Sequence, residues 1–215
     1  MKKIFSVLLI FVFLFNFAQE KPTFWKEIQE FKQMDKDIPP PKEAILLLGS
    51  SSFTMWTDVH NYFPEKTFIN RAFGGSSLLD LNLYSNELLA PYQPKQIVIY
   101  CGENDIANNA KAKTVLNRFK NFYKEIRKYH PNIPVEYVSM KYSPSRENMW
   151  PQMKQANSLI QKYISKQKNI RYIDITKVMN DEKGNVRTDI FLEDMLHMKP
   201  EGYQLWTGVL APYLK

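Results

Sequence analysis

Short apolar runs without alternating polarity recur along this chain, and segments with helical periodicity separate them. Four of the runs have the length of a buried strand and a fifth is weaker; in chain order they are residues 44–48, 67–70, 96–100, 135–140 and 170–175. Strands that are apolar on both faces and alternate with helices form a parallel sheet with helices on both sides. The sequence therefore predicts an α/β fold, a three-layer α/β/α sandwich with a mainly parallel, flavodoxin-like five-stranded sheet.

The segments between the runs predict the helices. Apolar residues recur at helical spacing over residues 23–34, 78–89, 115–129 and 153–163. A last helix is expected to begin at Pro200, because proline is favoured in the first turn. The sequence contains no internal repeat, low-complexity segment or linker, and 215 residues suffice for one sizeable core. We therefore expect a single folded domain.

The first residues have the pattern of a secretory signal peptide. Two lysines precede an almost unbroken apolar run from Ile4 to Phe15, and the segment ends on the small residue Ala18. A membrane anchor is the alternative, but a spanning helix needs about 20 apolar residues and this run is shorter. We expect residues 1–18 to be cleaved and residues 19–215 to form the exported domain, periplasmic or secreted, without a stable membrane anchor.

The net charge indicates which partners the chain could bind, and the cysteine content indicates what stabilises its fold. The formal net charge of +7 falls by two to +5 when Lys2 and Lys3 are removed. The remaining lysines alternate with acidic residues, as over residues 120–128, so they predict a solvated surface and no nucleic-acid partner. Cys101 is the only cysteine, so an exported chain of this kind is held by its core and not by an intrachain disulfide.

Polar clusters follow the first two predicted strands, at the carboxyl ends where such sheets bind ligands. Gly49-Ser50-Ser51-Ser52 follows the first strand. A serine there exposes its hydroxyl and turns its N–H into the cleft, although a plain serine-rich helix cap has the same pattern. The segment 70–77, with Gly74 and Gly75, follows the second strand. It lacks the lysine and spacing of a phosphate-binding P-loop, so it predicts a turn that donates one N–H to an anion, or a structural turn.

Two further clusters lie downstream. Residues 100–105 close the third strand, and Asn104 beside a glycine can aim its amide at a developing oxyanion, although Asn and Asp also build ordinary turns. Asp194-Met195-Leu196-His197 precedes the last helix. His60 and His130 are scattered, and neither spacing nor cysteine count fits zinc, so we expect no metal and no cofactor. His197, with Asp194 able to accept its Nδ1 proton, is left as the general-base candidate.

The four clusters together resemble the SGNH hydrolase family, also called GDSL esterases and lipases. Their order is that of the family: a serine turn after the first strand, a glycine after the second, G-x-N-D after the third and D-x-x-H near the C-terminus. The resemblance runs from about Ala44 to the last helix. The name motif of the family has Asp and Leu where this chain has Ser50 and Ser52. The register of the serine survives, but this chain lacks the carboxylate that the family has in the turn.

The resemblance implies a role for each matching residue. Ser51 would be the nucleophile, and its own N–H would serve an oxyanion hole. Gly75 would supply the second backbone donor and Asn104 the side-chain donor. His197 would be the base and Asp194 its orienting partner, so that an acyl group is transferred to Ser51 and then to water.

The resemblance also sets the expected activity. It implies an exported serine esterase that removes a short acyl group, with acetyl favoured, from a carbohydrate or small-molecule ester. Asp105 is expected to hold its loop and not to react. Asp189 and Glu193 are the alternative carboxylates if Asp194 points away from the base.

Two other functions remain open on the sequence. One is a lysophospholipase or thioesterase-type acyl hydrolase. The other is a non-catalytic glycan-binding module on the same fold, in which aromatic side chains stack on a sugar ring. The aromatics near the expected cleft are Phe53, Trp56, Phe73 and Trp150, although aromatics of this kind more often belong to the core.

Overall fold

The five strands lie at the five predicted apolar runs, with ends that differ by a few residues. A computed structural model describes residues 21–215, so the expected signal peptide at 1–18 lies outside the described residues. The strands are β1 (Ile45–Gly49), β2 (Phe68–Asn70), β3 (Gln96–Tyr100), β4 (Val135–Val138) and β5 (Ile170–Ile173). Every residue of β1, β3 and β4 is buried, which explains why these runs carry no alternating polarity.

The strand order places the first and third strands side by side at the centre of the sheet. The order is β2-β1-β3-β4-β5, and all neighbouring pairs are parallel. The chain therefore leaves β1 toward one edge of the sheet and returns to β3 on the other side. Ligands bind in such sheets at this reversal, outside the carboxyl ends of the strands. The flavodoxin-like order and the parallel sheet confirm the predicted fold class.

Helices connect the strands. They are α1 (Trp25–Asp37), α2 (Ser51–Thr54), α3 (Val59–Tyr62), α4 (Leu78–Leu83), α5 (Ser85–Leu89), α6 (Glu103–Ala107), α7 (Ala112–Tyr129), α8 (Trp150–Ile164) and α9 (Pro200–Leu210). Residues 21–215 also form three short 3-10 helices: η1 (Pro144–Met149), η2 (Lys177–Met179) and η3 (Ala211–Tyr213). Over residues 21–215, none of the helices has the length and apolar content needed to cross a membrane.

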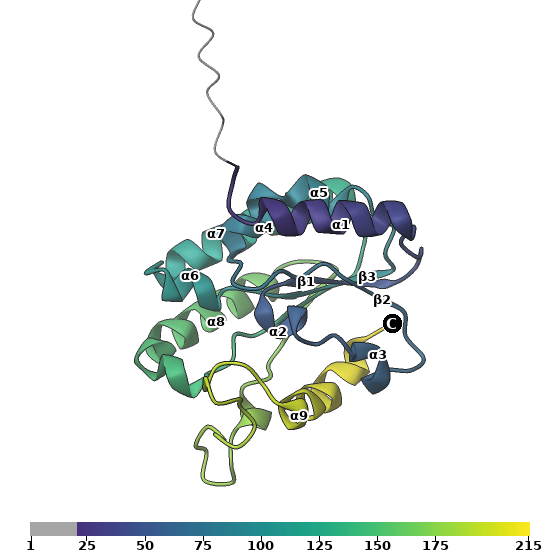
Figure 1. Cartoon of the computed structure of the whole chain (residues 1–215). Helices are drawn as coiled ribbons and strands as arrows, with labels where there is room; N and C mark the ends of the chain where they lie inside the picture. Colours follow the sequence, from purple (N-terminus) through teal and green to yellow (C-terminus); the bar gives the residue numbers. More distant parts are fainter. Residues whose placement is uncertain (1–20) are drawn as a thin grey trace, which may run out of the picture.

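The sheet separates two hydrophobic cores. Leu46 and Leu48 of β1 face the core formed with α1, α4, α5, α7 and α8. Ile45 and Leu47 face the other core, formed with α2, α3 and α9. Figure 1 shows the same division, with α1, α4 and α5 on one side of the sheet and α3 and α9 on the other. This arrangement is the predicted three-layer sandwich.

One helix prediction was wrong. The periodicity over residues 78–89 predicts a single helix, but the structure has two, α4 and α5, which meet at Tyr84 (φ −102°, ψ 19°). The Tyr84 side chain is buried, and its hydroxyl donates to the Thr23 carbonyl at 2.6 Å, ahead of α1. This contact joins segments 61 residues apart, and helical periodicity carries no information about it.

Candidate active site

The serine turn joins β1 directly to α2, and Ser51 is the first residue of that helix. Gly49 makes this possible because its φ is +145° and a Cβ there would lie 1.9 Å from the Tyr100 carbonyl oxygen. The Ser50 carbonyl accepts the N–H groups of residues 53 and 54, which closes the first turn of α2. The Tyr203 hydroxyl of α9 donates to the Ser52 carbonyl at 2.9 Å. Ser51 is consequently held at the carboxyl edge of the sheet with its side chain half-buried.

Three of the predicted site residues form a hydrogen-bonded chain. The Ser51 Oγ lies 3.0 Å from His197 Nε2, across 146 residues of sequence. On the other side of the ring, His197 Nδ1 lies 2.5 Å from Asp194 Oδ2. The structure therefore brings together a hydroxyl, an imidazole and a carboxylate in the order that serine hydrolases use.

The loop before α9 holds the Asp194 carboxylate in place. Asp194 Oδ1 accepts the backbone N–H groups of Leu196 and His197, each at 2.9 Å. Partial burial raises the pKa of Asp194, but hydrogen bonds from the His197 backbone and ring and from the Leu196 N–H outweigh it and lower the pKa to about 2. The carboxylate is therefore charged at neutral pH and accepts the Nδ1 proton of His197.

The two alternative carboxylates do not occupy this position. Asp189 pairs with Arg187, whose Nη2 lies 2.5 Å from Asp189 Oδ2. Glu193 is exposed to solvent. Because Asp194 points toward His197, neither alternative is needed to complete the chain.

The three donors that the resemblance assigns to an oxyanion hole, Ser51, Gly75 and Asn104, differ in their hydrogen-bond partners. Within residues 21–215, neither the Ser51 N–H nor the Gly75 N–H donates to another group. Gly75 has a φ of +82°, a conformation that side chains rarely adopt, and it is exposed. The third donor, Asn104 Nδ2 at the start of α6, donates to Ser50 Oγ at 2.8 Å and to the Ser76 carbonyl at 2.9 Å. Ser50 thus provides a neutral acceptor for this amide where the name motif of the family has a carboxylate.

A buried ion pair that the sequence did not reveal lies beneath the serine turn. Lys141 follows β4, and its side chain is 1% exposed. Its Nζ lies 3.0 Å from the Glu103 carboxylate, 3.1 Å from Ser52 Oγ and 3.2 Å from the Tyr100 hydroxyl, which itself donates to Glu103. Burial lowers the pKa of Lys141, and the charge of Glu103 opposes this shift. The cluster joins the ends of β3 and β4 to the turn that carries Ser51.

The connection between β4 and α8 also contacts both halves of the site. The N–H and the Oγ of Ser145 donate to the Met195 carbonyl at 3.0 and 2.9 Å, and Met195 lies within the loop that carries the acid and the base. Arg146 Nη2 donates to Asn104 Oδ1 at 2.7 Å. This polar segment follows a predicted strand, like three of the four clusters identified from the sequence. Its position at the carboxyl end of that strand was the signal that could have identified it.

Asp105 makes contacts of the structural kind that was expected of it. It is fully buried, and its carboxylate accepts the Leu78 N–H at 2.8 Å and Arg118 Nη1 at 2.8 Å. Burial raises its pKa, and the hydrogen bonds from Arg118 and Leu78 oppose the shift. These contacts tie α6, which follows β3, to α4 and α7.

Most of the aromatic residues proposed to stack on a sugar belong to the core. Phe53, Trp56 and Phe73 are buried, so the stacking alternative is wrong for these three. Trp150 is half-buried, and its Nε1 donates to the Ser143 carbonyl at 2.9 Å.

The other two histidines lie apart from the site. His130 contacts the Leu89 carbonyl through Nε2 at 3.1 Å, and His60 is exposed. In the described part of the chain, no group of three or more His, Cys, Asp or Glu side chains is arranged to hold a metal ion.

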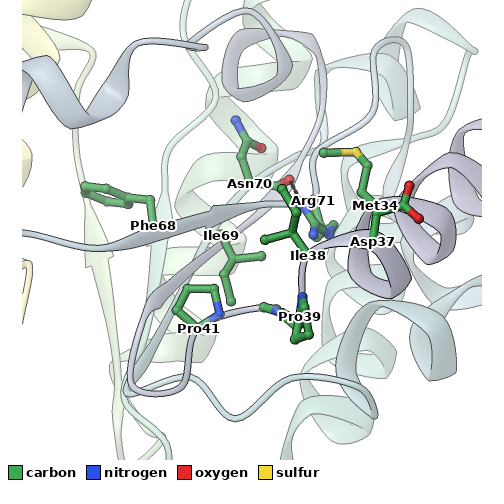
Figure 2. A pocket seen from close by; sticks show the side chains of 10 residues that line it. Met34, Asp37, Ile38, Pro39, Pro41, Phe68, Ile69, Asn70 and Arg71 are labelled. Atoms are coloured by element: carbon green, nitrogen blue, oxygen red, sulfur yellow. Dashed lines mark hydrogen bonds between the residues drawn. The ribbon is translucent and has the colours of Figure 1, made fainter.

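A cavity of about 360 Å³ lies beside β2, away from Ser51. It is lined by residues of the C-terminal part of α1 and the prolines that follow, and by residues 68–71 (Figure 2). The guanidinium of Arg71 in the cavity wall already forms an ion pair with Asp35. Its Nε donates a hydrogen bond to the Tyr92 hydroxyl oxygen. Neither Ser51 nor His197 lines this cavity.

Solved structures with the same fold cover most of the chain. A structure from Streptococcus pneumonia, provisionally described as a platelet activating factor, matches with a TM-score of 0.78 and 19% identity, over 88% of this chain and 92% of that chain. A GDSL-like lipase from Bacteroides thetaiotaomicron matches with a TM-score of 0.72 and 18% identity, over 86% and 96%. A family 3 carbohydrate esterase from Talaromyces cellulolyticus matches with a TM-score of 0.64 and 13% identity, over 79% and 95%. At these identities the likeness shows a shared fold.

The sequence itself identifies the family. No curated protein matches the chain. The model of the GDSL-like lipase/acylhydrolase family matches residues 48–205, from the end of β1 into α9, and so includes all four polar clusters. The resemblance seen in the sequence is thereby confirmed, and the chain belongs to the GDSL-like lipase/acylhydrolase family.

Proposed function

We propose that the protein is an exported serine esterase that hydrolyses short-chain acyl esters, with acetyl favoured, of carbohydrates or other small molecules. Membership of the acylhydrolase family implies ester hydrolysis. The observation that carries the proposal is the hydrogen-bonded chain from Ser51 through His197 to Asp194 at the carboxyl edge of the sheet. A binding module has no need of such a chain.

The proposed reaction has two steps. Ser51 Oγ attacks the ester carbonyl carbon while His197 Nε2 takes its proton, and the tetrahedral intermediate then expels the alcohol, which receives that proton. Water next attacks the acyl-enzyme, again giving its proton to His197, and the acid leaves as Ser51 recovers its hydroxyl. Asp194 keeps the Nδ1 proton on the far side of the ring, so Nε2 is free to act as the base.

The oxyanion would be stabilised by backbone and side-chain donors. The N–H groups of Ser51 and Gly75 have no other acceptor within residues 21–215. Asn104 Nδ2 already has two acceptors, so it must share or exchange one when the oxyanion forms. The Ser50 hydroxyl is the acceptor to exchange, because it is neutral and can rotate, and hydrogen bonds to an ionised acceptor are about twice as strong as those to a neutral one.

Structures of the same fold favour one substrate class. Two structures of the same fold are described as family 3 carbohydrate esterases, which favours a carbohydrate ester. The alternative is a lysophospholipase or thioesterase-type acyl hydrolase, which would use the same residues on a longer acyl chain.

Acyl-chain length separates these alternatives. We expect residues 19–215 to hydrolyse p-nitrophenyl acetate with a kcat/KM at least about tenfold above that for the octanoate, since a few methylene groups that a pocket cannot accept cost at least this much. Butyrate should fall between the two, and the Ser51→Ala variant should hydrolyse each of them at no more than a trace of the wild-type rate. A preference for octanoate would favour the longer-chain alternative. Equal background rates for the wild type and for Ser51→Ala would contradict the proposed esterase activity and favour glycan binding.

Export is proposed from the sequence of residues 1–18. A cationic start, an apolar run and a small final residue support cleavage near Ala18. When the full chain is expressed in a bacterium, we expect protein outside the cytoplasm whose intact mass lacks these residues. Full-length protein that stays in the cytoplasm would contradict export.

A further inference from the structure

Arg146 contacts the side chain that is the proposed oxyanion donor. Its Nη2 donates to Asn104 Oδ1 at 2.7 Å, and its Nη1 lies 3.4 Å from Glu103 Oε2. The side chain of Arg146 is 15% exposed. The backbone of η1 leaves helical geometry at this residue, with φ −117° and ψ 24°. Arg146 lies outside the four polar clusters that define the family resemblance.

The contact determines which way the Asn104 amide faces. An asparagine amide has an acceptor on one side and two donors on the other, and rotation by 180° exchanges them. A guanidinium only donates, so it requires Oδ1 on its side. The Ser76 carbonyl only accepts, so it requires Nδ2 on the opposite side, where the distance is 2.9 Å. In the reversed amide, two donors would face each other and two acceptors would face each other.

The charge of Arg146 acts in the same direction. A cation that binds Oδ1 withdraws electron density from the amide, and hydrogen bonds in a chain strengthen one another. The Nδ2 protons thereby become better donors to a negative oxygen. The positive charge also lies on the side of the amide away from that oxygen, where it stabilises charge that develops in the transition state.

We propose that Arg146 is a positioning residue for ester hydrolysis, which holds the Asn104 amide with Nδ2 turned toward the oxyanion. This inference rests on the proposed function, because it assigns to Arg146 a role in the same site. Ser145 stabilises the segment next to it through its two hydrogen bonds to the Met195 carbonyl. One short connection after β4 therefore supports both the oxyanion donor and the loop of the acid and base.

Removal of Arg146 should leave the fold intact. The Glu103 carboxylate still accepts hydrogen bonds from Lys141 Nζ at 3.0 Å, from the Lys141 N–H at 3.1 Å and from the Tyr100 hydroxyl. It is therefore not left buried without partners. Arg146→Met retains most of the apolar stem that packs against the segment. The variant therefore removes the guanidinium and little else.

A double-mutant cycle on Arg146 and Asn104 tests the proposal. We expect Asn104→Ala to lower kcat for p-nitrophenyl acetate by about a hundredfold or more, as for other single oxyanion donors. Arg146→Met should lower kcat by about tenfold to a hundredfold with little change in KM, because the lost interaction acts in the transition state. In the Asn104→Ala background, Arg146→Met should cost less than about threefold further, because the side chain it acts through is absent. Arg146→Lys should recover part of the loss, since an ammonium reaches Oδ1 but lacks the fork.

Two controls separate positioning from general effects. Arg187→Met removes another arginine that pairs with a carboxylate in a connecting segment, and kcat should stay at the wild-type value. The Asn104 side-chain amide resonances, identified by their absence in Asn104→Ala, should move in the NMR spectrum of Arg146→Met and not in that of Arg187→Met. This second readout does not depend on turnover.

Particular outcomes would overturn the inference. If the losses of Arg146→Met and Asn104→Ala multiply in the double variant, or if Arg146→Met turns over like wild type, Arg146 does not act through Asn104. Unmoved amide resonances in Arg146→Met would lead to the same conclusion. Failure of the proposed function is distinct, because the wild-type protein would then show no hydrolysis that Ser51→Ala abolishes.

Discussion

Replacement of Ser51 by alanine is expected to lower kcat for p-nitrophenyl acetate by about 10⁵–10⁶-fold, the loss seen when a serine nucleophile is removed from a triad. The variant lacks the oxygen that forms the acyl-enzyme, and His197 then has no hydroxyl to deprotonate. The remaining rate comes from substrate binding and the oxyanion donors alone. Initial rates at high enzyme concentration measure the effect, and the melting temperature should change little because only one half-buried oxygen is lost.

The neighbouring serine provides the matched control. Ser52 belongs to the same turn, but its Oγ is buried and lies 3.1 Å from Lys141 Nζ, not beside His197. Ser52→Ala should therefore keep at least about a tenth of the wild-type kcat, since it loses one structural hydrogen bond. If Ser51→Ala keeps activity within tenfold of wild type while Ser52→Ala is inactive, the register of the nucleophile is wrong.

Replacement of Asp194 by asparagine is expected to lower kcat by about 10⁴-fold, the effect of forcing the wrong histidine tautomer in a serine triad. The Asp194 carboxylate accepts two backbone N–H groups through Oδ1 and the ring through Oδ2. An asparagine can keep its oxygen on the two N–H groups, which places its NH₂ against Nδ1. That nitrogen must then be unprotonated, so the proton moves to Nε2, which can no longer take the proton of Ser51.

A second carboxylate in the same loop tests whether the effect is specific. Asp189 is exposed and pairs with Arg187, so Asp189→Asn should leave kcat within about twofold of wild type, as surface substitutions usually do. Rates of the two variants on p-nitrophenyl acetate, with unfolding curves for both, provide the comparison. Equal losses in the two variants, or an Asp194→Asn variant that keeps a tenth of the activity, would remove Asp194 from the assigned role.

The elements of the sheet were predictable from local pattern, whereas their contacts were not. A strand buried on both faces must be apolar throughout, so a run such as residues 96–100 is recognisable from the sequence alone. The pair of helices over residues 78–89 was predicted as one, because the interruption at Tyr84 accompanies a contact with Thr23 on a distant segment. Hydrophobic periodicity records which face is buried and not which residues lie against it.

Some residues of the site were also predictable from the sequence, whereas the roles of others were not. Ser51, Asn104, Asp194 and His197 lie in short motifs whose order along the chain was readable, and the structure brings all four to one edge of the sheet. The role of Ser50 could not be predicted from the sequence. Its hydroxyl matters only because it lies 2.8 Å from the amide of Asn104, 54 residues away.

The contacts of Lys141, Ser145 and Arg146 could be found only in the folded structure. In the sequence they are ordinary polar residues after a strand, and an isolated lysine or arginine is most often solvated. Their contacts are made with residues 38 to 89 positions away, through distances that depend on the packing of β3, β4 and the last loop. The layers and the available chemistry follow from the sequence alone, because burial pattern and motif order are local properties. The tertiary structure decided which charged groups support the reacting ones, because hydrogen bonds and ion pairs require distances that only the folded chain sets.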